Sequence, residues 1–563
     1  MSGWAGPCRV PSWPEVGRAR RSGARPLIGR SRDRAARIAA MATTPPPTGS
    51  GRTAPGRDRH ARLLPAPPGS PDAGGEPPRA AVVGGGIAGV AAAVGLAERG
   101  VRVVLHERED QLGGRVRGWT TATGETMTRG FHAFFRQYYN LRALLRRVDP
   151  DLAMLRPVPD YPLVHAAGTR ESFAGLPLTP PWNVAGFVLR SDTFTLRDLT
   201  RMDTRAATAL FDVSLPRTYA ELDGLDADAF LRGIRFPDTA RHLAFEVFSR
   251  SFFAHPSALS AAELATMFHI YFLGSSEGLL FDVPRDPYPA TIWRPLHRHL
   301  ESLGVEVRTG STVDRVLRRP GGFRVLGDDV DAVVLATDVR GLRSVVAGSD
   351  LGTPAWRARV DGLRTTPPFL VSRLWLDRPA RRDRPPFLGT SGFGYLDNIS
   401  VLDLFEDEAR AYRERTGGSV VELHAYALPE DADQEAVVAR LVEEAEAVYP
   451  ELTGARVVQA EHVRAADCPL FAPGSFPGRP AVTTPDPALV LAGDLTRVDL
   501  PVALMERAAT TGFLAANTLL ARWGVRGHDL WTVPNRGRSA LLRGAARRAR
   551  TGGRRDRQPS TVD

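Results

Sequence analysis

Three glycines and one acid have the clearest chemical purpose in the chain: Gly84, Gly86 and Gly89, in the spacing G-x-G-x-x-G, and Glu107. In such a turn the first glycine makes the tight bend, the second lets the backbone approach a pyrophosphate, and the third lets a helix pack closely on a strand. Glu107 lies 21 residues after Gly86, where a carboxylate binds a ribose hydroxyl pair and its charge would repel a 2′-phosphate. The spacing predicts a dinucleotide site that disfavours NADP.

The elements that must position these residues follow in the right order. Residues 81–83 are a β-branched run typical of a strand, an alanine-rich helix extends to about residue 99, and a second strand over 101–105 leads to Glu107. The start of the helix offers unpaired N–H groups and a positive dipole end to the phosphates. A glycine turn alone can be a packing feature of an alanine-rich chain, but strand, helix, strand and acid together favour a cofactor site.

Leu112-Gly113-Gly114-Arg115 extends this motif, since paired glycines let the chain pass close to a cofactor and a guanidinium can pair with phosphates. The extended motif resembles the large FAD-dependent family that contains amine oxidases, protoporphyrinogen oxidase and carotenoid desaturases. The resemblance implies FAD rather than NAD as the cofactor, with Gly114 and Arg115 among the residues that bind it.

The family resemblance implies an α/β fold, in which an FAD-binding Rossmann-like domain of the GR2 type carries an inserted α+β substrate domain. We expect the FAD-binding domain at 79–150, 295–345 and 461–535, and the substrate domain at 151–294 and 346–460. The Arg-rich, Pro- and Gly-rich segments 1–78 and 536–563 have no apolar periodicity, and we expect them to be disordered.

Two later segments complete the expected FAD site. Strands are predicted at 304–308, 312–316 and 331–337, and the resemblance implies that the backbone of Val313 contacts the adenine. A further strand at 489–492 delivers Gly493 and Asp494, and the helix that follows, to about Trp523, carries Met505 near its start. In the family this region binds the pyrophosphate and ribitol, where a carboxylate accepts from a sugar hydroxyl and a helix dipole favours the anion.

Composition narrows the class of protein. The 563 residues include only two cysteines, which excludes a disulfide framework or a cysteine-based metal site and fits a reducing compartment. We expect no metal site. All 73 basic residues are Arg, and without Lys a side-chain Schiff base is impossible, which also weakens amine oxidation as the activity. The net charge of +10 combines +9 over 1–79 and +7 over 536–563 with −6 on the rest of the chain. The positive charge thus lies in low-complexity tails, so nucleic acid is a poor candidate partner.

The candidate catalytic residues lie in the aromatic segment 130–141, which resembles plant-type phytoene and ζ-carotene desaturases. By residue type alone His132 would be a packed core histidine. The family pattern instead brings the segment to the flavin, so we predict His132 as a proton acceptor, with Phe135 and Arg136 beside it. Arg136 stands where the family usually has glycine, which makes the transfer of active-site shape less direct.

The predicted substrate domain is rich in aromatic residues. Phe245, Phe248 and Phe252 share one helical face, and the aromatic run 267–273 follows. Such stripes are ordinarily core, but they can also line a tunnel for a large apolar substrate or rest in a bilayer interface. The domain also contains predicted strands at 369–376, 419–426 and 456–460. A helix capped by Asp433 is predicted to bury Val437, Leu441, Ala445 and Val448.

Within the carotenoid desaturases the chain is most similar to actinobacterial isorenieratene synthases, the φ-ring-forming enzymes. Segments 129–141, 282–299, 500–508 and 531–534 carry this likeness. It implies an FAD-dependent oxidoreductase acting on CH–CH groups that desaturates the β-ionone ring of β- or γ-carotene, with methyl migration, to give an aromatic φ-ring.

The same likeness implies a hydrophobic carotenoid substrate and an electron acceptor such as a quinone or oxygen. It also implies a cytoplasmic location with peripheral attachment to the inner face of the membrane, since no apolar run reaches the ~18 residues of a spanning helix. Two alternatives stay open: another FAD-dependent oxidase or desaturase acting on a linear carotenoid or an amine, and a non-enzymatic binding module like the GDP-dissociation inhibitors.

Overall fold

A computed structural model describes residues 57–555, apart from 192, 195 and 238–251. All of these residues belong to the compact unit 54–563. Phe245 and Phe248 lie outside the described residues, whereas Phe252 is buried and packs edge-on against Phe471.

Five strands that are far apart in the sequence form one parallel sheet in the order β11-β3-β2-β15-β21. Their bounds are β2 (Arg79–Val83), β3 (Arg102–His106), β11 (Glu306–Arg308), β15 (Ala332–Leu335) and β21 (Leu489–Leu491). The predicted strand–helix–strand motif is therefore present, and the segments around residues 306, 333 and 490 join it in one sheet. Parallel strands direct their carboxyl ends to one edge, so the loops that follow all five strands meet there.

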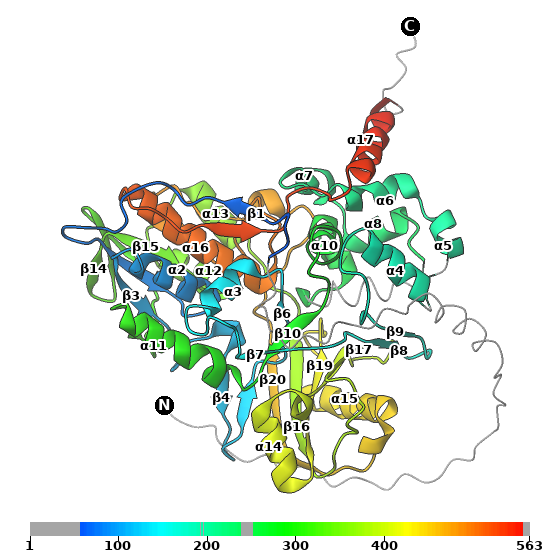
Figure 1. Cartoon of the computed structure of the whole chain (residues 1–563). Helices are drawn as coiled ribbons and strands as arrows, with labels where there is room; N and C mark the ends of the chain where they lie inside the picture. Colours follow the sequence, from blue (N-terminus) through cyan, green and yellow to red (C-terminus); the bar gives the residue numbers. More distant parts are fainter. Residues whose placement is uncertain (1–56, 192, 195, 238–251, 556–563) are drawn as a thin grey trace, which may run out of the picture. The chain divides into compact units, whose positions relative to one another are not determined.

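Helix α2 (Ile87–Ala97) follows β2 and is buried along its whole length. It packs against α16 (Leu504–Arg522), as Figure 1 shows for the blue and orange-red helices. Small residues permit this close approach: a Cβ on Gly512 would stand 2.3 Å from the carbonyl oxygen of Ala88. The alanines and glycines of both helices therefore serve helix–helix packing as well as helix formation.

A seven-stranded sheet has the order β20-β16-β19-β18-β17-β8-β9 and is antiparallel except between β17 and β8. Its strands are β8 (Leu163–His165), β9 (Arg170–Glu171), β16 (Phe369–Leu376), β17 (Phe387–Ser391), β18 (Asn398–Val401), β19 (Ser419–Ala425) and β20 (Val457–Ala465). Helix α15 (Gln434–Val448) packs on this sheet. As predicted, the Asp433 side chain caps α15 by accepting from the Ala436 N–H, and Val437, Leu441 and Ala445 are buried; Val448 is half-buried.

Shorter elements complete the described chain. Four small sheets contain β1 (Arg62–Leu64) with β22 (Leu530–Thr532), β4 (Gly118–Thr120) with β5 (Thr126–Thr128), β6 (Phe134–Phe135) with β10 (Phe281–Pro284) and β7 (Leu155–Pro157), and β12 (Leu317–Arg319) with β13 (Gly322–Val325) and β14 (Asp328–Val330). The remaining α-helices are α3 (Tyr139–Leu145), α4 (Trp182–Arg190), α5 (Leu196–Arg201), α6 (Thr204–Phe211), α7 (Arg217–Leu222), α8 (Ala227–Gly233), α10 (Ala261–Phe268), α11 (Arg294–Ser302), α12 (Val339–Ala347), α13 (Pro354–Asp361), α14 (Asp407–Thr416) and α17 (Ala540–Arg555).

The expected disorder is wrong for residues 57–78. Strand β1 pairs with β22, and the buried carboxylate of Asp58 accepts from the Ser276 N–H and forms an ion pair with Arg538. The segment lacks apolar periodicity because three residues suffice for β1, and long-range hydrogen bonds hold the rest. Such partners leave no local pattern in the sequence.

The C-terminal expectation is also wrong in part, because α17 occupies 540–555. Its residues Ala546 and Arg550 reach α6 and its neighbourhood: Ala546 is buried, and Arg550 forms an ion pair with Asp212. Arg, Ala and Leu are strong helix formers, and this propensity outweighs the high charge of the segment.

Two finer boundaries also differ from expectation. Residues 312–316 form no strand, although Val313 is buried beside the parallel sheet. Strand β20 crosses the expected boundary at 460/461, so residues 461–465 belong to the seven-stranded sheet. Among the described residues, no helix combines the length and apolar character needed to cross a membrane.

Candidate functional site

A cavity of about 540 Å³ opens at the carboxyl edge of the parallel sheet and continues toward the seven-stranded sheet. At its floor lies the turn between β2 and α2. Gly84 has φ +107, and a Cβ there would stand 2.6 Å from the carbonyl oxygen of Ala336. Gly86 precedes the first residue of α2. A Cβ placed on Gly86 would have the Gly114 Cα as its nearest neighbour, at 3.9 Å. The first amides of α2 therefore face an open cradle of backbone.

Glu107 lines the same floor and is nearly buried. Its Oε2 accepts from the Gly85 N–H at 2.7 Å, and its Oε1 accepts from the Glu109 N–H at 3.0 Å. These two backbone bonds fix the carboxylate in position, and each oxygen keeps a further lone pair for a hydroxyl donor.

The Gly113-Gly114 turn crosses above the first glycine turn, with the Gly113 N–H donating to the Gly85 carbonyl at 2.9 Å. Both glycines have positive φ, and a Cβ on Gly113 would stand 2.8 Å from the Cα of Arg117. The next residue, Arg115, donates to the Asp494 carboxylate at 2.5 Å. Burial alone would lower the pKa of Arg115, but the charge of Asp494 overcomes this effect and raises it well above the ordinary value.

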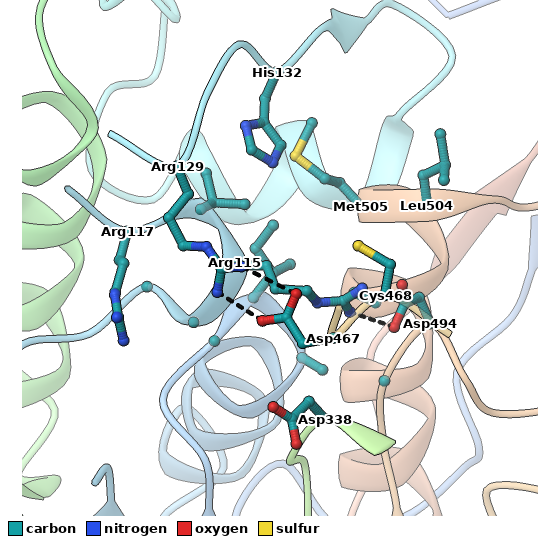
Figure 2. Close-up of a pocket in the computed structure, with 18 of the residues that line it drawn as sticks. Arg115, Arg117, Arg129, His132, Asp338, Asp467, Cys468, Asp494, Leu504 and Met505 are labelled. Carbon is teal, nitrogen blue, oxygen red and sulfur yellow. Dashed lines mark hydrogen bonds and ion pairs between the residues drawn. The ribbon is translucent and has the colours of Figure 1, made fainter. Parts of the chain in front are cut away.

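Figure 2 shows this ion pair together with a second one beside it. Arg129 donates from two nitrogens to Asp467, at 2.7 and 3.0 Å. Next to Asp467 lies the thiol of Cys468, whose burial raises its pKa to about 11. The thiol is thus neutral at pH 7, and the fixed charges of this wall are those of the two arginine–aspartate pairs.

The last two cofactor segments also reach the cavity. Val313 and Thr337 line it from the loops beside the parallel sheet, and the Thr337 hydroxyl is buried with no hydrogen-bond partner in the described part of the chain. Gly493, with φ +141, is held by its N–H bond to the Thr511 hydroxyl at 2.9 Å. Met505 lies in the first turn of α16, where Figure 2 shows it beside His132.

These residues fit a flavin dinucleotide. The paired Gly86 and Gly114 leave backbone without Cβ atoms, the start of α2 supplies amide donors for phosphates, and Glu107 supplies acceptors for ribose hydroxyls. The unsatisfied Thr337 hydroxyl provides a further polar group that a bound molecule would satisfy.

Aromatic side chains line the part of the cavity nearer the seven-stranded sheet. Phe131 packs on Phe387 with ring centroids 4.5 Å apart, and Phe135 packs on Tyr271 at 4.4 Å. Phe281 stands edge-on between Phe131 and Phe135, 5.5 Å from each. The faces of Phe131, Phe135 and Phe281 carry no hydrogen-bonding groups, so this part of the cavity, called the aromatic chamber below, suits an apolar guest. Polar side chains of the seven-stranded sheet, among them His424 and Tyr426, line the cavity beside it.

His132 lies where the polar and aromatic parts meet. Its Nδ1 is 2.8 Å from the Gly130 carbonyl oxygen, which also accepts from the Tyr288 hydroxyl at 2.8 Å. A carbonyl can only accept, so Nδ1 carries the proton and Nε2 carries the lone pair. Burial lowers the pKa of His132 to about 4 despite the bond to Gly130, so the imidazole is neutral at pH 7.

The cavity thus brings together eleven of the thirteen residues singled out in the sequence: His132, Phe135, Gly84, Gly86, Glu107, Gly114, Arg115, Val313, Gly493, Asp494 and Met505. Gly89 and Arg136 are not among the described residues that line it. A Cβ on Gly89 would stand 1.8 Å from the Gly84 carbonyl oxygen, so Gly89 serves packing. For Arg136 a catalytic role stays a prediction that the geometry does not support.

Several cavity residues were not anticipated from the sequence, chiefly Arg129, Asp467, His424 and Tyr426. Arg129 and Asp467 come together from distant segments, so no local spacing marks them. His424 and Tyr426 do carry a signal: with Glu422 they place three polar groups two residues apart in a predicted strand, which directs them to one face.

The parallel sheet and the glycine cradle are those of an oxidoreductase that binds a dinucleotide cofactor, and the aromatic chamber adjoins this site. A family profile described as "Flavin containing amine oxidoreductase" matches residues 87–520. The chain belongs to this family. It has the family's FAD-binding α/β fold and is an FAD-dependent oxidoreductase, which confirms the predicted fold class and cofactor.

Individual relatives agree with this assignment. The chain is 61% identical over 498 residues to the carotenoid phi-ring synthase of Streptomyces griseus, covering 87% of this chain and 96% of the relative. It is 28% identical to the carotenoid phi-ring synthase of Chlorobaculum tepidum, covering 82% and 91%. Among solved structures, a putrescine oxidase variant superposes with a TM-score of 0.59 at 16% identity, covering 79% of this chain and 99% of the other, which shows the shared fold alone.

Proposed function

We propose that this enzyme oxidises the β-ring of β- or γ-carotene to a trimethylphenyl φ-ring. The observation that carries the proposal is the 61% identity to a carotenoid phi-ring synthase that is matched over 96% of its length. The aromatic chamber beside the glycine cradle supports the same substrate class, because a carotenoid ring is bulky and entirely apolar.

Aromatisation removes two hydrides and two protons from each ring, and one of the paired methyl groups must move to the neighbouring carbon. FAD, when bound, supplies the hydride acceptor. The chain itself must hold the ring, exclude water that would trap a ring cation, and accept the protons. The electron acceptor that restores FAD is a quinone or oxygen.

Phe131, Phe135 and Phe281 are suited to the first two tasks. Their side chains line the chamber with carbon and exclude water. A π face beside a ring cation stabilises the cation by electrostatic attraction. The mutual packing of these rings fixes them before the substrate arrives, so the stabilisation costs little reorganisation.

We propose His132 as the acceptor of one of the two protons. The bond from its Nδ1 to Gly130 orients the ring and leaves the lone pair on Nε2, and a pKa of about 4 keeps that lone pair available at pH 7. A base this weak suffices, because a proton lost from a ring cation is strongly acidic.

The FAD site proposed for this chain uses the residues predicted from its sequence: Gly84, Gly86, Glu107, Gly114, Arg115, Val313, Gly493, Asp494 and Met505. We also keep the division into an FAD-binding domain (79–150, 295–345, 461–535) and a substrate domain (151–294, 346–460) as a proposal. The five parallel strands fall in the first set and most of the seven-stranded sheet in the second.

We propose a cytoplasmic enzyme that attaches peripherally to the inner face of the membrane, where its apolar substrate dissolves. Helix α4 supports this, because Trp182 and Leu189 are 67% and 70% exposed and Arg190 follows them. Replacing both apolar residues by Ser should weaken sedimentation with anionic phospholipid vesicles. The matched control Leu541→Ser removes an exposed leucine of α17. Equal loss of vesicle binding in both would contradict the role of α4.

Expression of the full chain in a β-carotene-producing host tests the activity. The proposal expects pigments whose ring is aromatic and retains all its methyl carbons. Accumulation of unchanged β-carotene with flavin-loaded protein in the cells would contradict it.

A further inference from the structure

Three polar residues of the seven-stranded sheet, called the relay below, are joined by hydrogen bonds and end in the cavity. Glu422, His424 and Tyr426 are spaced by two along β19 and just beyond it, so they share one face of the sheet. His424 and Tyr426 line the cavity, and His424 packs against Gly130, where a Cβ would stand 2.8 Å from its ring. This chain of groups lies next to His132 and approaches the chamber from the sheet.

Glu422, at the end of the relay farthest from the cavity, carries a permanent negative charge. Arg373 lies directly opposite Glu422 on β16 and donates to its Oε2 from Nε at 3.0 Å and from Nη2 at 2.7 Å. Burial raises the pKa of Glu422, but the charge of Arg373 and the bond from His424 reverse this and lower it to about 2. Glu422 is therefore a carboxylate at any working pH.

The fixed carboxylate sets the direction of the remaining hydrogen bonds. His424 Nε2 is 2.8 Å from Glu422 Oε1, so Nε2–H donates to the carboxylate. When the imidazole carries this one proton, Nδ1 carries the lone pair. Nδ1 is 2.8 Å from the Tyr426 oxygen, which also accepts from Asn398 Nδ2 at 2.8 Å. The Tyr426 hydroxyl thus donates to His424, and Tyr426 lines the cavity.

We propose that Tyr426 is a catalytic proton acceptor, backed by His424 and Glu422 as positioning residues. The inference rests on the proposed function, in which each ring loses two protons and His132 accounts for one. In the step assigned to Tyr426, a ring C–H bond of the cation breaks and its electron pair completes a ring double bond. The proton forms a new O–H bond on Tyr426 while the original O–H proton passes to His424 Nδ1.

The charges balance in this step. A ring cation and a neutral tyrosine–histidine pair become a neutral ring and an imidazolium, which the Glu422 carboxylate stabilises. Arg373 also donates to the Thr126 carbonyl and the Thr128 hydroxyl, so it ties β16 to β5. The ion pair itself contributes little to stability compared with apolar residues of the same volume. A relay that holds a positive charge after each turnover does require a fixed, buried carboxylate.

Two variants remove the relay without removing its shape. Tyr426→Phe keeps the ring and deletes the acceptor, and His424→Gln keeps a side-chain amide for hydrogen bonding but cannot take a proton. The matched controls are Tyr412→Phe and His462→Gln, neither of which alters a residue among the described lining of the cavity. Tyr412→Phe removes one hydroxyl bond, to the Leu376 carbonyl, whereas Tyr426→Phe removes two, with His424 and Asn398.

Purified flavin-loaded proteins are compared for β-carotene conversion, flavin content and melting temperature. Loss of a general base typically costs about 10²- to 10⁴-fold in rate. The proposal expects such a fall in kcat for Tyr426→Phe and His424→Gln, with KM, flavin content and melting temperature equal to those of the controls.

Three outcomes overturn the proposal. Wild-type kcat in either relay variant would remove the proton role. Loss of flavin or of melting temperature beyond the controls, in proportion to the lost activity, would show a structural polar network instead. A wild-type protein that makes no aromatic ring contradicts the proposed function and the relay with it, whereas a failure of the relay alone leaves wild-type aromatisation intact.

Discussion

Replacing Gly86 or Gly89 by alanine should impair the protein for two different reasons: the first change should weaken FAD binding, and the second should lower the stability of the fold. Gly86 has an extended backbone with φ −79, and its Cβ position is 3.9 Å from the nearest atom, so the protein without cofactor has room for a methyl group. Alanine is a poorer residue than glycine at the start of a helix, which destabilises the fold, whereas the loss of glycine's freedom in the unfolded chain stabilises it. Each effect is about 0.5–1 kcal/mol and the two oppose each other, so the apoprotein should melt as wild type does.

FAD binding should respond differently to the same change. The methyl group occupies the space through which the pyrophosphate approaches the α2 amides. Losing one charge-assisted hydrogen bond costs about 1.5–3 kcal/mol, which is roughly 10- to 150-fold in Kd. Gly89→Ala is the matched control: its Cβ would stand 1.8 Å from the Gly84 carbonyl oxygen, so overpacking should cost about 1–3 kcal/mol of stability.

Apoprotein melting curves and FAD titrations on both variants test this reasoning. Gly86→Ala should have normal melting and weak binding, and Gly89→Ala should have depressed melting. If Gly86→Ala binds FAD with wild-type affinity, the cradle is not where the pyrophosphate lies.

Three further predictions concern other parts of the molecule. Asp494→Asn removes the charged partner of Arg115, so FAD affinity should fall about 10- to 100-fold. The matched control Glu451→Gln breaks the ion pair with Arg384, which has similar burial and lies away from the cavity, and it should leave FAD titrations unchanged. His132→Ala should retain FAD and accumulate partly oxidised rings in pigment extracts, whereas a joint loss of flavin and stability in this variant would mean that His132 has only a packing role. In the wild type the rate should fall as the pH drops through about 4, where His132 gains a proton. A chain that begins at residue 57 should have the melting temperature of the full chain. A chain that begins at 76 lacks β1 and Asp58 and leaves Arg538 unpaired, so its melting temperature should be lower. Equal melting temperatures for these two truncated chains would show that residues 57–75 do not stabilise the fold.

The sequence predicts the cofactor half of this enzyme better than its substrate half, for physical reasons. Gly84, Glu107 and Asp494 lie in or beside the elements that position them, so strand, turn and helix signals locate each one. Phe369–Leu376 and the Asp433-capped helix follow strict periods and are recovered with nearly their observed bounds.

What the sequence does not reveal depends on distant partners. Asp58 is ordered by Ser276 and Arg538, and Arg129 meets Asp467 across 338 positions, so neither leaves a local pattern. Residues 312–316 have the alternation of a strand, but no neighbouring strand pairs with them in the described chain. His424 and Tyr426 were visible as a period-two polar pattern, which gains meaning only once Arg373 is found opposite Glu422.

The most direct test of the central claim is the mass and proton spectrum of the product that purified, FAD-loaded protein makes from β-carotene in lipid vesicles. The account predicts a product that has lost four hydrogens for each converted ring and no carbon, with aromatic ring protons and three aryl methyl groups on that ring. A product that retains the paired ring methyls, or that is desaturated only along the polyene chain, would contradict it.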